Sequence, residues 1–276
     1  MAARKTSKKL KPVSSGYAPV NGLEMYYETY GSGGTPLILL HGGFSAIGSS
    51  FGKLIPELSM NRQVIGVDMQ AHGHTADIDR PISFENLSDD IAAFMKYLNL
   101  ERADFFGYSV GAGVALYLVL RHPELVRKLV LATVSYLGSG MQPGLLEGMA
   151  NIQPEMMVGS PWHDEYMRIA PHPENFPQLV SKVKAFNANV KDLDPEQIRA
   201  IKAPVLLIFG DSDIVQLEHV VNIFRLLGGG IEGTMGLPNS QLAVLPATAH
   251  QNVIDRATIL LSIIPPFLDA PMPSAR

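Results

Sequence analysis

Short apolar runs recur along this chain at the length of β-strands, and helical patterns separate many of them. The runs span residues 37–40, 64–67, 103–106, 128–133, 205–209 and 242–245, after a hairpin expected at 17–20 and 24–30. The Asn21-Gly22 pair between the two hairpin strands is typical of a tight turn. Strands that alternate with helices predict an α/β fold, with a mostly parallel sheet and helices on both of its faces.

Two helices are predicted from their residue patterns. Apolar residues recur at helical spacing between Phe84 and Leu98, and Ser83 is placed to cap that helix at its N-terminus. A second helix, over 110–121, is rich in small and apolar residues and ends before His122-Pro123. We therefore expect one helix before the strand at 103–106 and one directly after it.

Residues 136–195 interrupt this alternation of strands and helices. They contain seven of the 20 prolines and five of the 12 methionines, and Trp162 is the single tryptophan of the chain. Thioether and aromatic side chains suit a pocket for an apolar group, but they also suit a segment that packs onto a neighbouring domain. We name Tyr108, Tyr136, Met141 and Trp162 as candidate pocket residues, and both interpretations stay open.

Ser109 lies where an apolar strand runs into the helix of small residues. It is the centre of Gly107-Tyr108-Ser109-Val110-Gly111, a Gly-x-Ser-x-Gly pattern that is weak evidence by itself. Between a strand and a helix, such a serine has a strained backbone that exposes its hydroxyl above the sheet, and the flanking glycines let the turn close. The context therefore predicts Ser109 as a nucleophile.

A serine nucleophile needs a base and an acid, and both follow Ser109 at the ends of predicted strands. A histidine takes the serine proton, and a carboxylate fixes the tautomer of that histidine. His250 ends the loop after the strand at 242–245, and the strand at 205–209 runs into a loop with two carboxylates, Asp211 and Asp213. Asp211 can instead accept backbone N–H groups in its turn. Because catalytic groups gather at the carboxyl ends of parallel strands, we expect these side chains to meet.

An oxyanion site is expected upstream of the nucleophile. The strand at 37–40 is followed by the glycine turn His41-Gly42-Gly43-Phe44. Oxyanion holes of this kind combine the N–H after the nucleophile, here that of Val110, with one N–H from such a loop. Position in the motif favours Gly43, and Phe44 is the alternative.

Together these motifs resemble the α/β-hydrolase superfamily over about residues 20–268, and the segment from Asp68 to Thr75 adds to the resemblance. The resemblance implies that Ser109, Asp213 and His250 are nucleophile, acid and base. It also implies a main domain over 17–135 and 196–270, with residues 136–195 inserted as a cap over the active site. The chain departs from the family pattern at two places. Gln70-Ala71 stands where Arg-Gly is usual, and Ala247-Thr248-Ala249 replaces a loop that is usually glycine-rich.

Composition limits the other function classes. The net charge of −4 offers no electrostatic basis for binding nucleic acid or an anionic membrane, and every apolar run is well short of the ~20 residues that span a bilayer. Five Lys or Arg among the first eleven residues precede no apolar signal-peptide core, so residues 1–16 are expected to form a disordered basic leader and the protein to be cytoplasmic. The chain has no cysteine, no metal-ligand spacing and no phosphate-binding glycine pattern, so neither a metal nor a cofactor is expected.

The residues and the resemblance together predict a serine hydrolase that cleaves a small-molecule carboxylic ester through an acyl-enzyme intermediate. Serine at the strand–helix turn argues against haloalkane dehalogenase and epoxide hydrolase chemistry, for which this superfamily uses aspartate at that position. Three alternatives remain: a cofactor-free perhydrolase, a carbon–carbon bond hydrolase on the same triad, and a non-catalytic small-molecule binding protein on a hydrolase scaffold. The basic side chains of the cap give no clear acid-binding pocket of the kind that the carbon–carbon hydrolase needs.

Overall fold

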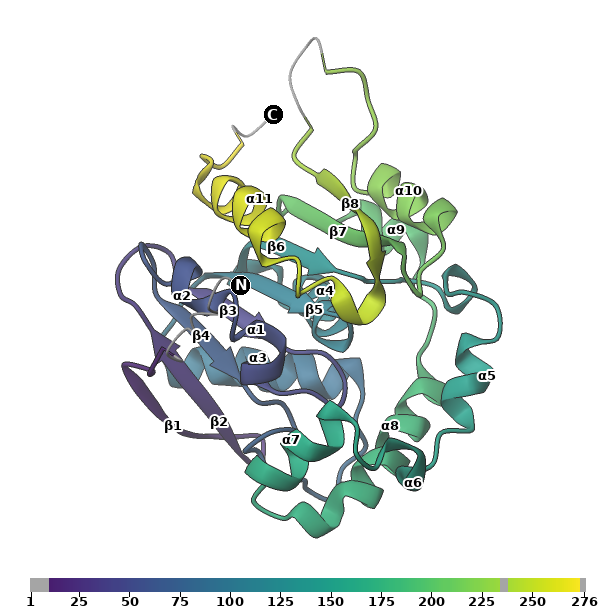
Figure 1. The fold of residues 1–276 in the computed structure, drawn as a ribbon. Helices are drawn as coiled ribbons and strands as arrows, with labels where there is room; N and C mark the ends of the chain where they lie inside the picture. Colours follow the sequence, from purple (N-terminus) through teal and green to yellow (C-terminus); the bar gives the residue numbers. More distant parts are fainter. Residues whose placement is uncertain (1–9, 234–237, 274–276) are drawn as a thin grey trace, which may run out of the picture.

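The computed structural model describes residues 10–233 and 238–273, and an eight-stranded sheet forms the centre of this part of the chain (Figure 1). The strands lie in the order β1-β2-β4-β3-β5-β6-β7-β8. Their bounds are β1 Ser14–Val20, β2 Leu23–Tyr30, β3 Leu37–Leu40, β4 Val64–Val67, β5 Ala103–Tyr108, β6 Val126–Ala132, β7 Val205–Ser212 and β8 Gln241–Ala249. β1 and β2 pair antiparallel, β2 joins β4 antiparallel, and β3 to β8 are parallel. The predicted mostly parallel sheet is confirmed.

The opening hairpin differs from its prediction at one end. Asn21 and Gly22 have φ values of 48° and 86°, as the tight hairpin turn requires. The first strand begins at Ser14, which pairs with Thr29, so residues 14–16 belong to the sheet rather than to a leader. Residues 1–9 of the expected leader lie outside the described residues. The polar sequence of 14–16 hid this strand, because pairing with β2 needs only backbone groups at a sheet edge.

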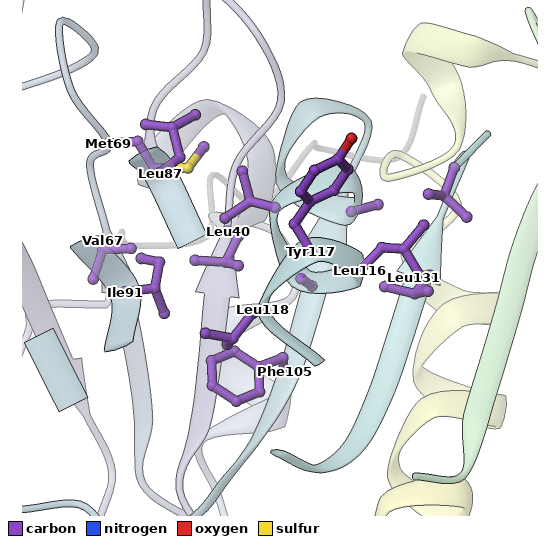
Figure 2. Packing of buried hydrophobic residues seen from close by; sticks show 14 of the residues in the cluster. Leu40, Val67, Met69, Leu87, Ile91, Phe105, Leu116, Tyr117, Leu118 and Leu131 are labelled. Atoms are coloured by element: carbon purple, nitrogen blue, oxygen red, sulfur yellow. The ribbon is translucent and has the colours of Figure 1, made fainter. Parts of the chain in front are cut away.

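Two groups of helices cover the two faces of the sheet. Alternate residues of β3 show this division, since Ile38 and Leu40 join one apolar cluster while Leu37 and Leu39 join the other. The first face is covered by α3 (Phe84–Tyr97), α4 (Val110–Arg121) and α10 (Leu217–Leu226), and Figure 2 shows side chains of α3 and α4 packed with those of the strands. The second face is covered by α1 (Ile47–Phe51), α2 (Ile55–Leu58) and α11 (Ala257–Asp269). The short helix α9 (Pro195–Arg199) precedes β7 and contacts α10.

The helices begin where the residue pattern predicts. The Ser83 hydroxyl accepts a hydrogen bond from the Asn86 N–H at 3.1 Å, which caps α3. Leu87, Ile91 and Phe94 of this helix are buried, so its apolar stripe faces the sheet. Helix α4 is buried over most of its length because it packs on β3, β5 and β6 and against α3.

Residues 136–195, here called the cap segment, contain α5 (Leu145–Ala150), α6 (Pro154–Met157), α7 (Pro161–Ile169) and α8 (Phe176–Asn189). Figure 1 shows these helices together at one end of the molecule, away from α11. The two ends of the cap segment are joined, because the Leu193 N–H donates to the Tyr136 carbonyl at 2.9 Å. The 3-10 helices are Pro123–Leu125, Gly138–Gly140, Pro173–Asn175 and His250–Asn252. Across residues 10–233 and 238–273, no helix has both the length and the apolar character needed to cross a bilayer.

Candidate active site

Ser109 occupies a sharp turn between β5 and α4. Its φ of 53° and ψ of −117° are strained for a residue with a side chain, and its N–H is held by the Ala132 carbonyl at 2.9 Å. A Cβ at Gly107 would lie 2.3 Å from the Gly111 carbonyl oxygen, and one at Gly111 would lie 2.0 Å from the Leu40 oxygen. Both glycines of the motif are therefore required for β5, β3 and α4 to approach closely enough to form the turn.

The structure brings Ser109, His250 and Asp213 together from three strand ends. The Ser109 Oγ lies 3.0 Å from His250 Nε2, and His250 Nδ1 lies 2.8 Å from Asp213 Oδ1. Because an ionised carboxylate only accepts hydrogen bonds, the proton of neutral His250 lies on Nδ1 and leaves Nε2 to accept the serine proton. The side chain of Asp213 is fully buried, and that of His250 is 18% exposed. The arrangement can therefore remove a proton from Ser109 and stabilise the resulting imidazolium.

The two candidate carboxylates, Asp211 and Asp213, have separate roles. Asp213 Oδ2 accepts the Gly210 N–H at 3.0 Å and Oδ1 accepts the Ile214 N–H at 2.7 Å, so backbone groups orient it toward His250. Asp211 accepts the N–H groups of Ala247 and Thr248, at 2.8 and 3.0 Å, in the loop before His250. Those two hydrogen bonds to the charged form lower the pKa of Asp211. Asp211 thus accepts backbone N–H groups, but those of the histidine loop rather than those of its own turn, where they had been expected.

Tyr108 lies behind His250 and is absent from the lining of the cavity beside Ser109. Its ring is stacked on the imidazole with centroids 5.4 Å apart, and its hydroxyl donates to the His250 carbonyl at 3.0 Å. Burial raises the pKa of this phenol, so it remains a donor across the ordinary pH range. The prediction of Tyr108 as a pocket residue is therefore wrong, because the tyrosine side chain points from the strand toward the histidine and positions it.

The expected oxyanion donors lie next to the serine. A Cβ at Gly43 would be 3.2 Å from the Val110 side chain, so the glycine loop and the start of α4 are in close approach. Phe44 has a φ of 59°, in the left-handed region that a residue with a side chain rarely adopts. Among the described residues, none of the N–H groups of Gly43, Phe44 and Val110 donates a hydrogen bond to another protein group. These free donors and the N-terminus of α4 favour negative charge beside Ser109.

Buried histidines connect the glycine loop to the segment after β4. His41 donates through Nδ1 to the Gly42 carbonyl at 2.7 Å and accepts the Met69 N–H at Nε2 at 3.0 Å. Burial lowers the pKa of His41 and lowers that of His72 to about 4, which keeps both rings neutral near pH 7. These contacts agree with a structural role for both histidines.

A cavity of about 140 Å³ lies beside Ser109 and Val110. Its walls come from α3, α4, the segment after β6 and the cap segment, and they are mostly apolar. Tyr136 and Met141 line it, as predicted from their residue types. Trp162 does not line it, because this side chain lies on α7 and is 40% exposed, so the prediction for Trp162 is wrong. Sequence patterns could not reveal which face of a short cap helix turns outward.

Three aromatic residues of the cavity were missed by the sequence patterns. The ring of Phe84 stacks on Tyr117 at 4.9 Å and meets Phe186 edge-on at 4.8 Å. These side chains come from α3, α4 and α8, so only the fold brings them together. The one sign of this wall in the sequence is Gly113, a glycine within a helix. A Cβ at this position would lie 2.3 Å from the Phe84 ring, so the glycine makes room for that ring.

Tyr136 is held in the cavity wall by α10. Its ring stacks on His219 at 4.6 Å, its N–H donates to His219 Nε2 at 3.4 Å, and Asn222 donates to its hydroxyl at 3.0 Å. Burial lowers the pKa of His219, which keeps Nε2 available as an acceptor.

Groups of three or more side chains arranged to hold a metal ion are absent from residues 10–233 and 238–273.

Comparison with known proteins places this geometry in context. The family model described as alpha/beta hydrolase fold matches residues 35–177. The chain is 25% identical over 274 residues to the uncharacterized hydrolase YugF of Bacillus subtilis, which covers 90% of this chain and 96% of that protein. It is 27% identical over 256 residues to the pimeloyl-[acyl-carrier protein] methyl ester esterase of Neisseria meningitidis serogroup C, covering 84% of this chain and 92% of the esterase.

Solved structures share the fold at lower identity. The carboxylesterase CesB of Bacillus subtilis superposes with a TM-score of 0.70 at 18% identity, covering 93% of this chain and 91% of that one. The meta-cleavage product hydrolase CumD of Pseudomonas fluorescens superposes with a TM-score of 0.71 at 21% identity, covering 94% and 98%. At these identities the likeness concerns the fold.

Proposed function

Because the chain belongs to the alpha/beta hydrolase fold family, we propose that it is a serine hydrolase of carboxylic esters. Ser109 is the nucleophile, His250 the general base and Asp213 the acid. The observation that carries the proposal is the chain of contacts at 3.0 and 2.8 Å from Ser109 Oγ through His250 to Asp213. The esterase among the similar proteins supports the choice of an ester substrate.

The reaction proceeds in two steps. His250 Nε2 takes the Ser109 proton while Oγ attacks the ester carbonyl, and the N–H groups of Val110 and Gly43 stabilise the oxyanion. His250 then protonates the departing alcohol, and the acyl group stays on Ser109. A water molecule, deprotonated by His250, releases the carboxylic acid. Asp213 stabilises the imidazolium in both steps.

The acyl part of the substrate occupies the cavity beside Ser109. The departing alcohol must lie next to His250, which protonates it, and among the described residues His250 is not part of the cavity lining. The cavity therefore accepts the group on the other side of the carbonyl. An apolar cavity of about 150 Å³ binds benzene, so a volume of about 140 Å³ suits an acyl group of about six non-hydrogen atoms.

The cap cations disfavour the carbon–carbon hydrolase alternative. Lys182 donates to Asp77 and to the carbonyls of Ile78 and Arg80, so its charge is used to hold the cap segment to the main domain. Of the four basic side chains of the cap segment, Lys191 alone lines the cavity of Ser109. A substrate with two acidic groups would lack a pair of converging cations there.

Turnover of p-nitrophenyl esters from acetate to octanoate tests this function, beside labelling with a fluorophosphonate. We expect a maximum between butyrate and hexanoate, labelling of the wild type, and loss of both signals in Ser109→Ala. Turnover by Ser109→Ala at the wild-type level would refute the role of the serine. Labelling without turnover of any ester would refute the ester substrate while leaving the nucleophile. A folded wild type that is not labelled would favour the binding-protein alternative.

A further inference from the structure

Thr133 follows β6 and has an unusual backbone conformation. Its φ is 59°, in the left-handed region that a β-branched residue rarely adopts. The sequence pattern extended the strand through this residue, but β6 ends at Ala132 because Thr133 leaves the extended conformation. The Thr133 N–H donates to the Ile208 carbonyl at 2.8 Å, so pairing with β7 holds the strained residue in place. Strain of this kind is concentrated at functional sites.

The Thr133 side chain carries a second anomaly. Its hydroxyl is buried and has no hydrogen-bond partner among the described residues. The residue is only 3% exposed, and it lines the cavity beside Ser109. Buried hydroxyl groups in proteins almost always have a partner. The hydroxyl is shielded from the cavity in this rotamer, so an acceptor in the cavity can satisfy it once the side chain turns.

Thr133 is also close to the reacting group. The preceding residue, Ala132, accepts the Ser109 N–H at 2.9 Å and pairs with Tyr108 on the neighbouring strand. Adjacent strands lie about 4.8 Å apart. Because Tyr108 pairs with Ala132, the residues that follow them, Ser109 and Thr133, leave neighbouring strand ends. A turn of about 120° around the Cα–Cβ bond carries the hydroxyl to the position that its methyl group or its hydrogen now holds, and the backbone does not move. The hydroxyl meets the cavity in such an alternative rotamer.

From these observations we infer that the Thr133 hydroxyl donates a hydrogen bond to an acceptor oxygen in the acyl part of the substrate. The substrate class is then an ester of an oxygenated carboxylic acid, with an ether, keto or hydroxyl oxygen a few bonds from the ester carbonyl. The inference rests on the proposed ester hydrolase function. Most of the remaining wall is apolar and includes the aromatic rings of Phe84, Tyr117 and Phe186, so most of the rest of the acyl group is hydrocarbon.

Two pairs of substrates of equal size test the inference. p-Nitrophenyl methoxyacetate is compared with butyrate, and 3-methoxypropionate with pentanoate, because each pair differs only by an oxygen in place of a methylene. The readout is the ratio of kcat/KM for the ether to kcat/KM for the hydrocarbon. The ratio is measured for the wild type, for Thr133→Val, which keeps the branched shape, and for Thr133→Ser, which keeps the hydroxyl. Comparing variants cancels the intrinsic reactivity of each ester.

We expect the ratio to fall about tenfold in Thr133→Val for at least one pair, equivalent to about 1.4 kcal/mol, and to stay near the wild-type value in Thr133→Ser. Equal ratios in the wild type and Thr133→Val for both pairs would overturn the inference and leave the ester hydrolase standing. If Thr133→Val does not fold, as judged by its thermal transition, Thr133→Ala decides the same question. Alanine also lacks the hydroxyl, and it does not add the second γ-methyl group that valine brings. A wild type without turnover of any ester would refute the proposed function and this inference with it.

Discussion

Replacing Asp213 with asparagine should abolish most of the activity, whereas the same change at Asp211 should have a much smaller effect. Asp213 Oδ1 accepts from His250 Nδ1 at 2.8 Å and from the Ile214 N–H at 2.7 Å, while Oδ2 accepts the Gly210 N–H at 3.0 Å. An asparagine has only one acceptor oxygen, so its amide NH₂ group must face at least one of these donors. The buried carboxylate charge that stabilises protonated His250 is lost in either orientation.

The magnitude follows from that lost stabilisation. The equivalent change in a serine triad lowers kcat by about 10⁴, which corresponds to about 5.5 kcal/mol of transition-state stabilisation. We expect a similar loss in Asp213→Asn, because the Asp213 side chain is fully buried and bound directly to His250. Asp211 accepts the N–H groups of Ala247 and Thr248 and the Ser212 hydroxyl, and it is exposed. Asp211→Asn should therefore change kcat by less than about tenfold, or 1.4 kcal/mol.

The assay compares the two variants on the best p-nitrophenyl ester and follows their thermal unfolding. Single-turnover acylation is included so that a slow first step is separated from slow deacylation. A larger loss of kcat in Asp211→Asn than in Asp213→Asn would refute the assignment of the acid. Equal losses in two folded variants would show that the whole loop, and no single carboxylate, orients His250.

Three further changes test how the fold is held. Ala247 is exposed with a φ of 48°, so Ala247→Gly should relieve strain and stabilise the protein by about 1 kcal/mol, seen as a rise of about 2 °C in Tm; a fall in Tm would contradict this. Burial lowers the pKa of His72 from 6.5 to about 4, so the folded protein resists protonation of this ring. The free energy of unfolding is therefore unaffected by His72 above pH 6.5 and falls by roughly 3 kcal/mol as the pH drops to 4 and below. His72→Gln should flatten the dependence of unfolding free energy on pH in that window, and an unchanged slope in denaturant titrations would argue against it. Lys128 is buried and donates to the carbonyls of Phe267 and Leu268 at the end of α11. Lys128→Met should therefore lower the free energy of unfolding, measured in urea, by about 3 kcal/mol. A variant as stable as the wild type would show that those carbonyls find other partners.

The two departures from the family pattern show how far local chemistry could be anticipated. Ala71 and Ala247 stand where glycine is usual, and both have positive φ, 64° and 48°. The backbone keeps the conformation that glycine favours because the surrounding hydrogen bonds hold it. Gln70, in place of the usual arginine, is buried and accepts hydrogen bonds from Arg80, so a guanidinium reaches this region from elsewhere in the loop. Such compensation between distant positions is invisible in a short motif.

The central strands, the two helices that flank the strand of Ser109, the Ser109 turn and the order of its partners were determined by the sequence itself, because each depends on local patterns. Period-two and helical spacing decide which residues are buried, and the glycines at 107 and 111 leave the room that the close turn at Ser109 needs. Which of Asp211 and Asp213 contacts His250, the outward position of Trp162 and the aromatic wall from three helices were decided by the tertiary structure. So was the unpartnered hydroxyl of Thr133. These features depend on which segments meet after folding, and contacts between distant segments leave no periodic trace along the chain.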